Sequence, residues 1–325
     1  MSRTSTDPIP PPPTDPPVPL PQVPGPKLEP FTANAHADIE FLKFLGSPED
    51  KDSKVWKVNI DGHGPYALKL FLFNSWESLQ CHGNSLTKPL AKPKFYDGYF
   101  DPFNCECRVY GRLKQECRED LAVRSHGYLL LSPQQEHQVT NLMKSHSDGP
   151  IVSASDELDG YNFWGRFEEH RGHPIRAIVK EFASDGGEGF NSTQVEQLWE
   201  DVQDLHRLGI LVRDITYANY IGGKLVDFSR AWTMYHPCFD WTTPRQLKSN
   251  LQQDAQRLIG LLYTWARVNR EQHDAEGYDF EPPKGLKECS LAEDDCQDVD
   301  PGSYDWHKWE ADPEATEAFI DKALF

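Results

Sequence analysis

The chain has no long hydrophobic run. No stretch of about 18 consecutive apolar residues occurs in its sequence, and the N-terminus, MSRTSTDPIPPPP, has no apolar core of the kind that a signal peptide needs. We therefore expect neither membrane insertion nor secretion, and we predict an intracellular location, in the cytoplasm or the nucleus. The hydrophobic content of 38%, with 12% aromatic residues, is ordinary for a folded chain of 325 residues.

Cysteine is present in an odd number, and its spacing offers no zinc site. Of the seven cysteines, Cys105 and Cys107 are too close in sequence for a disulfide to be expected between them. The sequence also lacks the paired C-x-x-C or Cys/His spacings that a structural zinc site requires. We expect reduced thiols without a metal role.

Basic residues are fewer than acidic ones, with 33 lysines and arginines against 51 aspartates and glutamates. The formal net charge is −18, which argues against direct binding to nucleic acid, because phosphate neutralisation requires a basic face. Residues 267–325 hold 17 acidic and 6 basic residues, a net of −11. We expect the C-terminal extension, residues 268–325, to be a solvated acidic segment or, alternatively, a docking surface for a basic protein partner.

Proline is concentrated at the N-terminus, where residues 1–30 hold twelve of the chain's 26 prolines. A segment of this composition cannot form a regular ladder of backbone hydrogen bonds. The sequence predicts a disordered or polyproline II arm over residues 1–38. Such an arm is either a linker or a ligand for an aromatic-lined domain of a protein partner.

A β-rich pattern begins at residue 39. The strand-like segments KVWKVNI (54–60) and YALKLFLF (66–73) lie on either side of DGHG, in which Asp61 and Gly62 suit a hairpin turn. Further along the chain, the spacing of apolar residues predicts a helix over 104–120 and strands at 127–132 and 175–183.

A helix-rich pattern follows. Amphipathic helices are predicted at 194–209, after a Ser-Thr start signal, and at 246–268. Short strands at 210–212 and 224–228 lie between them. This order predicts an α+β fold with a boundary near residues 184–192. The predicted units are a β-rich lobe with insertions and a shortened helical lobe, at 39–183 and 184–267.

The stretch LVRDITYANYIGGKLVDFSRA, residues 211–231, holds three polar side chains suited to phosphoryl transfer. Asp214 follows one short strand, Asn219 lies five residues later in the same loop, and Asp227 follows the second short strand. Phosphoryl transfer requires a carboxylate that orients the attacking hydroxyl, oxygen ligands for Mg²⁺, and a cation on the nucleotide phosphates. These three residues can supply the first two.

The chain resembles the eukaryotic protein-kinase superfamily from about residue 39 to residue 267. VRDITYAN is similar to the catalytic loop of that family, DFS to its metal-binding motif and YALK to its phosphate-binding strand. The resemblance implies a two-lobed kinase-like fold, with a β-rich N-lobe and a helical C-lobe. It also implies a phosphotransferase that uses ATP and Mg²⁺, with an acceptor that the sequence does not specify.

The resemblance assigns a role to each of five residues. Asp214 corresponds to the catalytic base, and Asn219 and Asp227 correspond to the magnesium ligands. Lys69 would bind the nucleotide phosphates, and Glu106 of the predicted helix would pair with that lysine. Without the resemblance, Lys69 would be an edge-strand lysine, Glu106 an exposed helix acid, and the other three would be turn residues that bond their own backbone.

Several positions depart from the pattern of the family. The segment LGSPEDKDSKVWKV, residues 45–58, has only Gly46 where a glycine-rich phosphate loop is expected. Val212 replaces a histidine, Ser229 replaces the glycine after Asp-Phe, and Thr216 stands where peptide-phosphorylating members place a lysine. Nucleotide binding by this loop is therefore expected to be weak or unconventional.

The segment that normally docks a peptide is also shortened. Only 26 residues separate Asp227 from Asp254, which resembles the buried aspartate of the helix beneath the catalytic loop. Lys180 is expected at the entrance of the adenine pocket, where an apolar side chain is usual. Because the residues that chemistry needs are present, we interpret the chain as a phosphotransferase.

The alternative is a pseudokinase scaffold or interaction protein. A scaffold can retain the polar core of the fold while the features that regulate the site and recognise peptides are eroded. The segments ECRVYGRL and IVKEFA are also similar to those of fungal kinase-like proteins classed with an Fta-type subunit of the inner kinetochore. This second resemblance implies a fungal kinetochore subunit.

Overall fold

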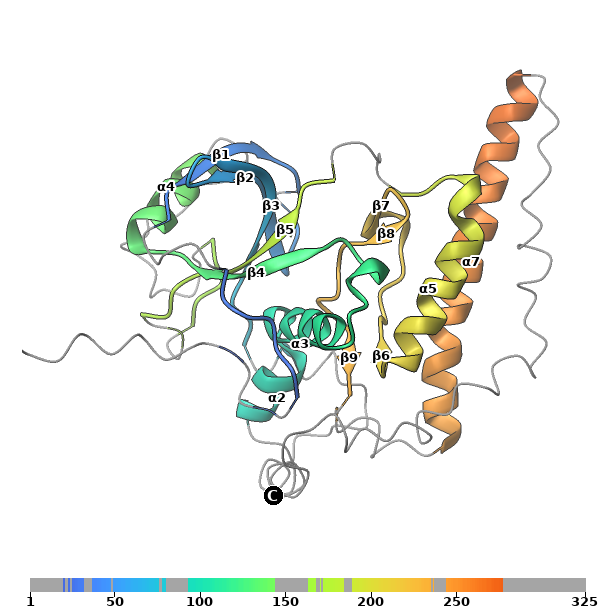
Figure 1. Ribbon diagram of the computed structural model, residues 1–325, viewed down its shortest axis with the longest axis horizontal. Coiled ribbons are helices and arrows are strands. Elements are labelled where there is room, and N and C mark those ends of the chain that lie inside the picture. The colour runs from blue at the N-terminus through green and yellow to red at the C-terminus, as the bar shows by residue number, and fades with distance from the viewer. Residues whose placement is uncertain are drawn as a thin grey trace, which may run out of the picture.

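Figure 1 shows the computed structural model, in which a β-rich part and a helix-rich part lie side by side. The structure describes residues 20, 23, 25–31, 37–47, 49–75, 78, 79, 93–143, 163–167, 170, 172–183, 189–234, 236 and 244–276. The architecture is mixed α+β with an antiparallel sheet, as the order of the predicted segments indicated. Within these ranges, no helix is long and apolar enough to span a membrane.

The β-rich part is one antiparallel sheet of five strands in the order β1-β2-β3-β5-β4. Asp61 and Gly62, the turn residues between β2 and β3, have φ angles of 50° and 74°. The predicted hairpin is therefore confirmed, because Asp-Gly readily adopts the left-handed conformation that this turn needs. The strands are β1 (Ile39–Phe44), β2 (Ser53–Ile60), β3 (His63–Phe71), β4 (Ser125–Leu130) and β5 (Arg176–Glu181).

Helix α3 (Pro102–Gln115) follows the short helix α2 (Pro93–Phe100) and lies beneath the sheet in Figure 1. Asp101 sets its start, because its carboxylate accepts a hydrogen bond from the Asn104 amide at 3.1 Å. The same carboxylate forms two hydrogen bonds of 3.0 Å with Arg176 of β5. The prediction of a helix over 104–120 is correct in type but placed too late, because apolar spacing marks the buried face and not the cap.

Residues 27–31, called the strap below, pack on α3 and β4. Leu28 is fully buried, and its amide donates to the Cys107 carbonyl at 2.8 Å. The Phe31 amide donates to the Tyr128 carbonyl, also at 2.8 Å. The strap therefore packs on the protein within the segment that was predicted as a disordered or polyproline II arm, since amides that precede or follow prolines remain able to form hydrogen bonds. Residues 1–19 lie outside the described part of the chain.

The helix-rich part contains α5 (Val195–Arg207) and α7 (Pro244–Glu276), which lie side by side in Figure 1. Both helices were predicted, and α7 extends beyond 246–268 at both ends. Two-stranded ladders join β6 (Ile210–Leu211) to β9 (Trp232–Thr233) and β7 (Tyr220–Ile221) to β8 (Lys224–Leu225). The remaining elements are α4 (Pro133–Met143) and the 3₁₀ turns Glu119–Leu121, Ser192–Gln194 and Tyr217–Asn219.

Two clusters of buried apolar side chains organise these elements. One lies between the sheet and α4 and includes Leu68, Val139 and Met143. The other includes Phe103 of α3 and Leu258 of α7, so α3, α5 and α7 share a single core. Because the two parts of the chain meet through this second cluster, the side chains between them are held by packed elements on both sides. The predicted boundary at 184–192 begins in residues outside the described part.

Candidate functional site

A cleft of about 740 Å³ lies between the sheet and the segment from Asp214 to Arg230. Four of the five residues singled out in the sequence line it: Lys69, Asp214, Asn219 and Asp227. The fifth, Glu106, lies behind the cleft and is fully buried in α3. The structure therefore brings together side chains that are separated by up to 158 positions, from 69 to 227.

Lys69 lies at the inner wall of the cleft on β3, with a side chain only 4% exposed. Its ammonium group forms an ion pair with Glu106 of α3 and a second one with Asp227, with 2.8 Å between Nζ and Oδ1. One lysine thus joins the sheet, α3 and the segment that follows β8. The pairing of Lys69 with the helix glutamate is the contact that the family resemblance implied.

Lys180 is a second buried lysine at the same wall. It lies opposite Ala67 in the β3–β5 ladder, so its side chain leaves the same face of the sheet as that of Lys69. Its ammonium donates to Glu106 Oε2 and to the Val226 carbonyl, each at 2.6 Å. Sequence reasoning identified Lys180 as unusual but missed this role. The available signal was a lysine within the apolar strand RAIVKE.

The charges of these residues are balanced within the protein. Burial disfavours the ammonium form of Lys69, but Asp227 and Glu106 outweigh burial and raise the pKa of Lys69. Burial likewise favours neutral Asp227, but Lys69 and Lys180 outweigh it and lower the pKa of Asp227 well below its usual range. Lys69 and Asp227 are therefore both charged at neutral pH, and the pair supplies no net charge to the cleft.

Asp254 of α7 organises the loop that carries Asp214. Its fully buried carboxylate accepts hydrogen bonds from the amides of Val212 at 2.7 Å and Arg213 at 2.8 Å, and lies 3.2 Å from His206 Nε2. Arg213 has a φ of 64°, a conformation that a residue with a side chain adopts only where its surroundings hold it. Asp254 therefore lies beneath the loop, where the resemblance placed it.

Asp214 and Asn219 contact each other at the outer part of the cleft. The side-chain amide of Asn219 donates to the Asp214 carbonyl at 2.8 Å and approaches its carboxylate at 3.3 Å. Asp214 is 37% exposed, with Arg257 at 3.9 Å. Its carboxylate is thus accessible from the cleft, whereas that of Asp227 is bound by Lys69.

The cleft offers oxygen ligands to a magnesium ion. Asp227 and the side-chain carbonyl of Asn219 belong to the cleft wall, and a hard cation of this kind takes its remaining ligands from phosphates and water. These residue types fit Mg²⁺ bound together with a nucleotide. Across the described ranges, no three His, Cys, Asp or Glu side chains gather into a metal site on their own.

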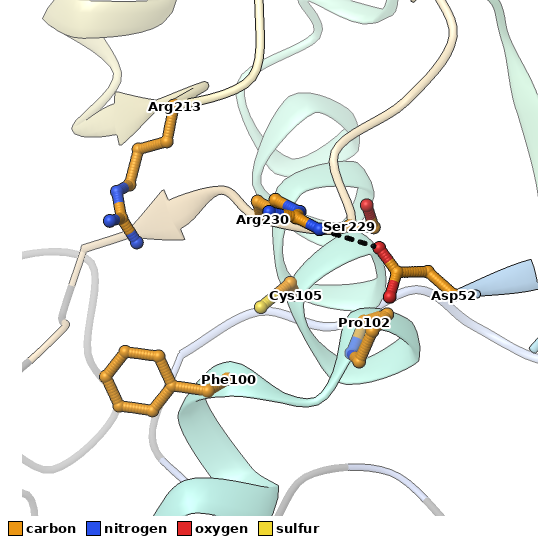
Figure 2. A pocket seen from close by; sticks show the side chains of 7 residues that line it. All are labelled: Asp52, Phe100, Pro102, Cys105, Arg213, Ser229 and Arg230. Atoms are coloured by element: carbon orange, nitrogen blue, oxygen red, sulfur yellow. Dashed lines mark hydrogen bonds and ion pairs between the residues drawn. The ribbon is translucent and has the colours of Figure 1, made fainter. Parts of the chain in front are cut away.

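An ion pair joins two residues of the cleft wall, Arg230 and Asp52. Arg230 Nη2 lies 3.4 Å from Asp52 Oδ2, and Figure 2 shows the guanidinium reaching toward that carboxylate beside Ser229. Beneath this pair is a void of about 10 Å³ that is lined partly by Cys105. Burial, together with nearby Asp101, raises the pKa of the Cys105 thiol, so it is protonated at neutral pH and is not a nucleophile.

Fold and site together define an α+β protein with a helix-backed antiparallel sheet and a cleft whose inner wall carries paired lysines and carboxylates. A family model described as kinetochore Sim4 complex subunit FTA2 matches residues 16–232. The match covers well over half of the chain, so the chain belongs to the FTA2 family. This confirms the Fta-type resemblance seen in the sequence. The protein-kinase resemblance stays a prediction, and no curated protein matches the chain.

Proposed function

We propose that this chain is a protein-binding subunit of a kinetochore complex and works in the nucleus as a scaffold. The observation that carries this proposal is the match to the FTA2 family over residues 16–232. That range includes the strap, the sheet, α3 and every residue of the cleft wall. The partners of the chain are then proteins, and its association with chromosomes is indirect, in keeping with the net charge of −18.

We propose further that the scaffold is a two-lobed kinase-like fold. The strand order β1-β2-β3-β5-β4 supports this, because α3 is inserted between β3 and β4 and contributes Glu106 to Lys69. The hydrogen bonds from the Asp254 carboxylate to the loop of Asp214 support it as well. The ion pair of Lys69 with Asp227 and the hydrogen bond from Lys180 to the Val226 carbonyl join the two lobes and hold them in a fixed relation, which is what a docking platform requires.

A scaffold is favoured over an enzyme because the residues that would bind phosphates in this cleft are replaced or already paired. Thr216 stands where peptide-phosphorylating members place a lysine, so the cation nearest Asp214 is Arg257, with 3.9 Å between the two side chains, and Lys69 is already paired on both sides. The loop of residues 45–53 contains a single glycine and three aspartate or glutamate side chains on the cleft wall. A polyphosphate entering this cleft therefore meets more carboxylates than an ATP site normally presents.

The test of the scaffold function is localisation at centromeres. In cells of its own species, chromatin immunoprecipitation of the tagged chain should enrich centromeric DNA over DNA from chromosome arms. The double variant Asp214→Asn, Asp227→Asn should show the same enrichment, since neither carboxylate is needed for docking. Enrichment of the wild-type chain no greater at centromeres than along the arms would overturn the proposal.

A second candidate function is Mg²⁺-dependent binding of ATP with slow phosphoryl transfer. It is favoured by the convergence of Lys69, Asp214, Asn219 and Asp227 on one cleft of about 740 Å³. Asp227 and Asn219 would hold Mg²⁺, Lys69 would contact the phosphates, and Asp214 would orient an acceptor hydroxyl. When bound, the metal would neutralise the charge of the nucleotide phosphates.

Thermal unfolding tests the second candidate. A ligand that binds the native state raises its melting temperature, so ATP with Mg²⁺ should stabilise the full chain more than ATP with a chelator does. Adenosine with Mg²⁺ is the matched control, because it lacks the phosphates. An unchanged melting temperature at millimolar ATP and Mg²⁺ would remove the nucleotide function and leave the scaffold function untouched.

A further inference from the structure

Four backbone amides in the loop between β1 and β2 already have partners within the protein. The Ser47 amide donates to the Asp50 carboxylate at 3.0 Å, and the Asp50 amide donates to the Ser47 carbonyl at 3.2 Å. The Leu45 and Glu49 amides donate to the Val55 carbonyl at 2.9 Å and to the Ser47 hydroxyl at 3.2 Å. The Asp50 carboxylate takes the place of an anion at the Ser47 amide, which favours recognition of phosphates by side chains of the cleft wall over recognition by this loop.

The cleft wall carries four cationic side chains, and they differ in how firmly they are held. Lys69 and Lys180 are almost fully buried and are bonded to the partners named above, so neither can leave the inner wall to reach an outer ligand without leaving a buried carboxylate unpaired. Lys51 lies in the loop between Asp50 and Asp52. Arg230 and the exposed Lys51 are the cations that a ligand can recruit at low cost, and of the two only the guanidinium of Arg230 can bind a phosphate through two parallel hydrogen bonds.

Within the described part of the chain, Arg230 is held only by its ion pair with Asp52. Its side chain is 46% exposed, that of Asp52 is 25% exposed, and their closest atoms are 3.4 Å apart. Exposed pairs of this kind change an equilibrium by about fivefold or less. A phosphate offers a guanidinium a bidentate, doubly charged partner in place of a single long contact. Figure 2 shows that Arg230 and Asp52 come from different segments of the chain and that their side chains point toward each other.

We propose that Arg230, released from Asp52, is the group that receives the phosphates of an oligophosphate ligand in this cleft, in place of a glycine-rich loop. Asp52 then acts as an internal competitor that lowers the affinity of the cleft. The inference rests on the second candidate function for the identity of the ligand, because a nucleotide supplies such phosphates. It adds which side chain recognises them and which one opposes binding.

Isothermal titration of the full chain tests this with three ligands, ATP with Mg²⁺, inorganic tripolyphosphate and adenosine. Arg230→Gln should weaken binding of both phosphate ligands about tenfold or more, since it removes a charge-assisted contact. Asp52→Asn should tighten binding of both about two- to fivefold, since it removes the competitor. Binding of adenosine should respond to neither substitution.

Two further variants separate a specific competitor from a general charge effect. Glu49→Gln removes another carboxylate of the cleft wall that has no contact with Arg230, and it should tighten binding less than Asp52→Asn does. In the double variant Asp52→Asn, Arg230→Gln, the gain from Asp52→Asn should vanish, because the two residues act through one pair. Equal gains from Asp52→Asn and Glu49→Gln, or a gain that persists in the double variant, would overturn the proposal.

The ligands also distinguish this inference from the nucleotide function. If the expected pattern occurs with tripolyphosphate but ATP does not bind, Arg230 is a phosphate-binding group and the nucleotide function fails. If ATP binds the wild-type chain and the Arg230 and Asp52 variants equally, the nucleotide function stands and the inference fails. Absence of phosphate binding by every variant, Asp52→Asn included, overturns both.

Discussion

Glu106 is shared by two buried lysines. One of its carboxylate oxygens pairs with Lys69, and the other accepts a hydrogen bond of 2.6 Å from Lys180. Glu106 is fully buried, so each oxygen depends on these partners in place of water. The sheet contributes both lysines and α3 contributes the glutamate. The position of α3 relative to the sheet is therefore fixed by charge as well as by packing.

Replacing Lys180 with methionine should reduce the free energy of unfolding by about 3 kcal/mol, because it leaves Glu106 Oε2 and the Val226 carbonyl without their buried donor. Urea denaturation measures this loss. Lys43→Met is the control, since Lys43 is an exposed lysine of β1 and its replacement should change stability by about 0.5 kcal/mol or less. Similar losses for both variants would mean that Lys180 does not support the structure through Glu106.

Gly111 should tolerate no side chain, because the strap crosses α3 at this residue. A Cβ atom there would lie 2.4 Å from the Lys27 Cα atom. Gly111→Ala should therefore destabilise the fold by roughly 2 kcal/mol through overpacking or loss of the strap. Gly260→Ala is the matched control in α7, where a Cβ meets nothing within 4 Å.

Alanine favours a helix more than glycine does, so the control should stabilise the protein by about 1 kcal/mol. Thermal and urea unfolding of both variants give the comparison. We therefore expect the free energy of unfolding to fall in Gly111→Ala and to rise in Gly260→Ala, although both variants replace a helical glycine with alanine. A neutral or stabilising effect of Gly111→Ala would show that the strap does not pack against α3 in solution.

His236 should make stability depend on pH. It is buried, and burial together with Arg108 lowers its pKa well below the usual histidine range. A histidine with a lowered pKa in the folded state binds fewer protons than in the unfolded state, so the free energy of unfolding falls as pH drops below about 6.5. For one such group the loss from pH 7.5 to 5.5 is about 1.4 kcal/mol.

His236→Phe keeps an aromatic ring beside Trp232, whose ring stacks on His236 at 5.1 Å between centroids. The variant should lose about 1.4 kcal/mol less stability than the wild type over this pH interval. His126, whose pKa is also lowered by burial and by Arg124, leaves a residual slope in both proteins. Parallel pH profiles of the two proteins would exclude His236 as the source.

If the cleft transfers phosphate, substitution of Asp227 should affect ATP binding and substitution of Asp214 should affect turnover. Asp227→Ala should abolish the Mg²⁺-dependent part of ATP binding, because the metal loses its carboxylate ligand. Asp214→Ala should leave binding nearly intact and remove turnover, because its contribution is made only as the acceptor hydroxyl attacks. Titration and release of phosphate from ATP measure the two effects. Turnover that persists without Asp214 would contradict its assigned role.

Local patterns in the sequence determined the elements of this fold. The β2–β3 hairpin follows from apolar segments around Asp61 and Gly62, because strand propensity and turn conformation depend on neighbouring residues. The helix α5 follows in the same way from its amphipathic spacing. The order of these elements also indicated the α+β class. The candidate cleft residues were identified from short motifs, because the chemistry of Asp, Asn and Lys side chains is a property of the residue types themselves.

The tertiary structure alone decided how those side chains are used. Lys180 contacts Glu106 across 74 positions, and Arg230 contacts Asp52 across 178. No periodicity links residues so far apart, because their distance depends on how the sheet, α3 and the segment after β8 pack together. The same holds for the strap, which composition places in a disordered arm. Its place on α3 depends on the missing side chain of Gly111, which is a property of the packed interface and not of the proline-rich segment itself.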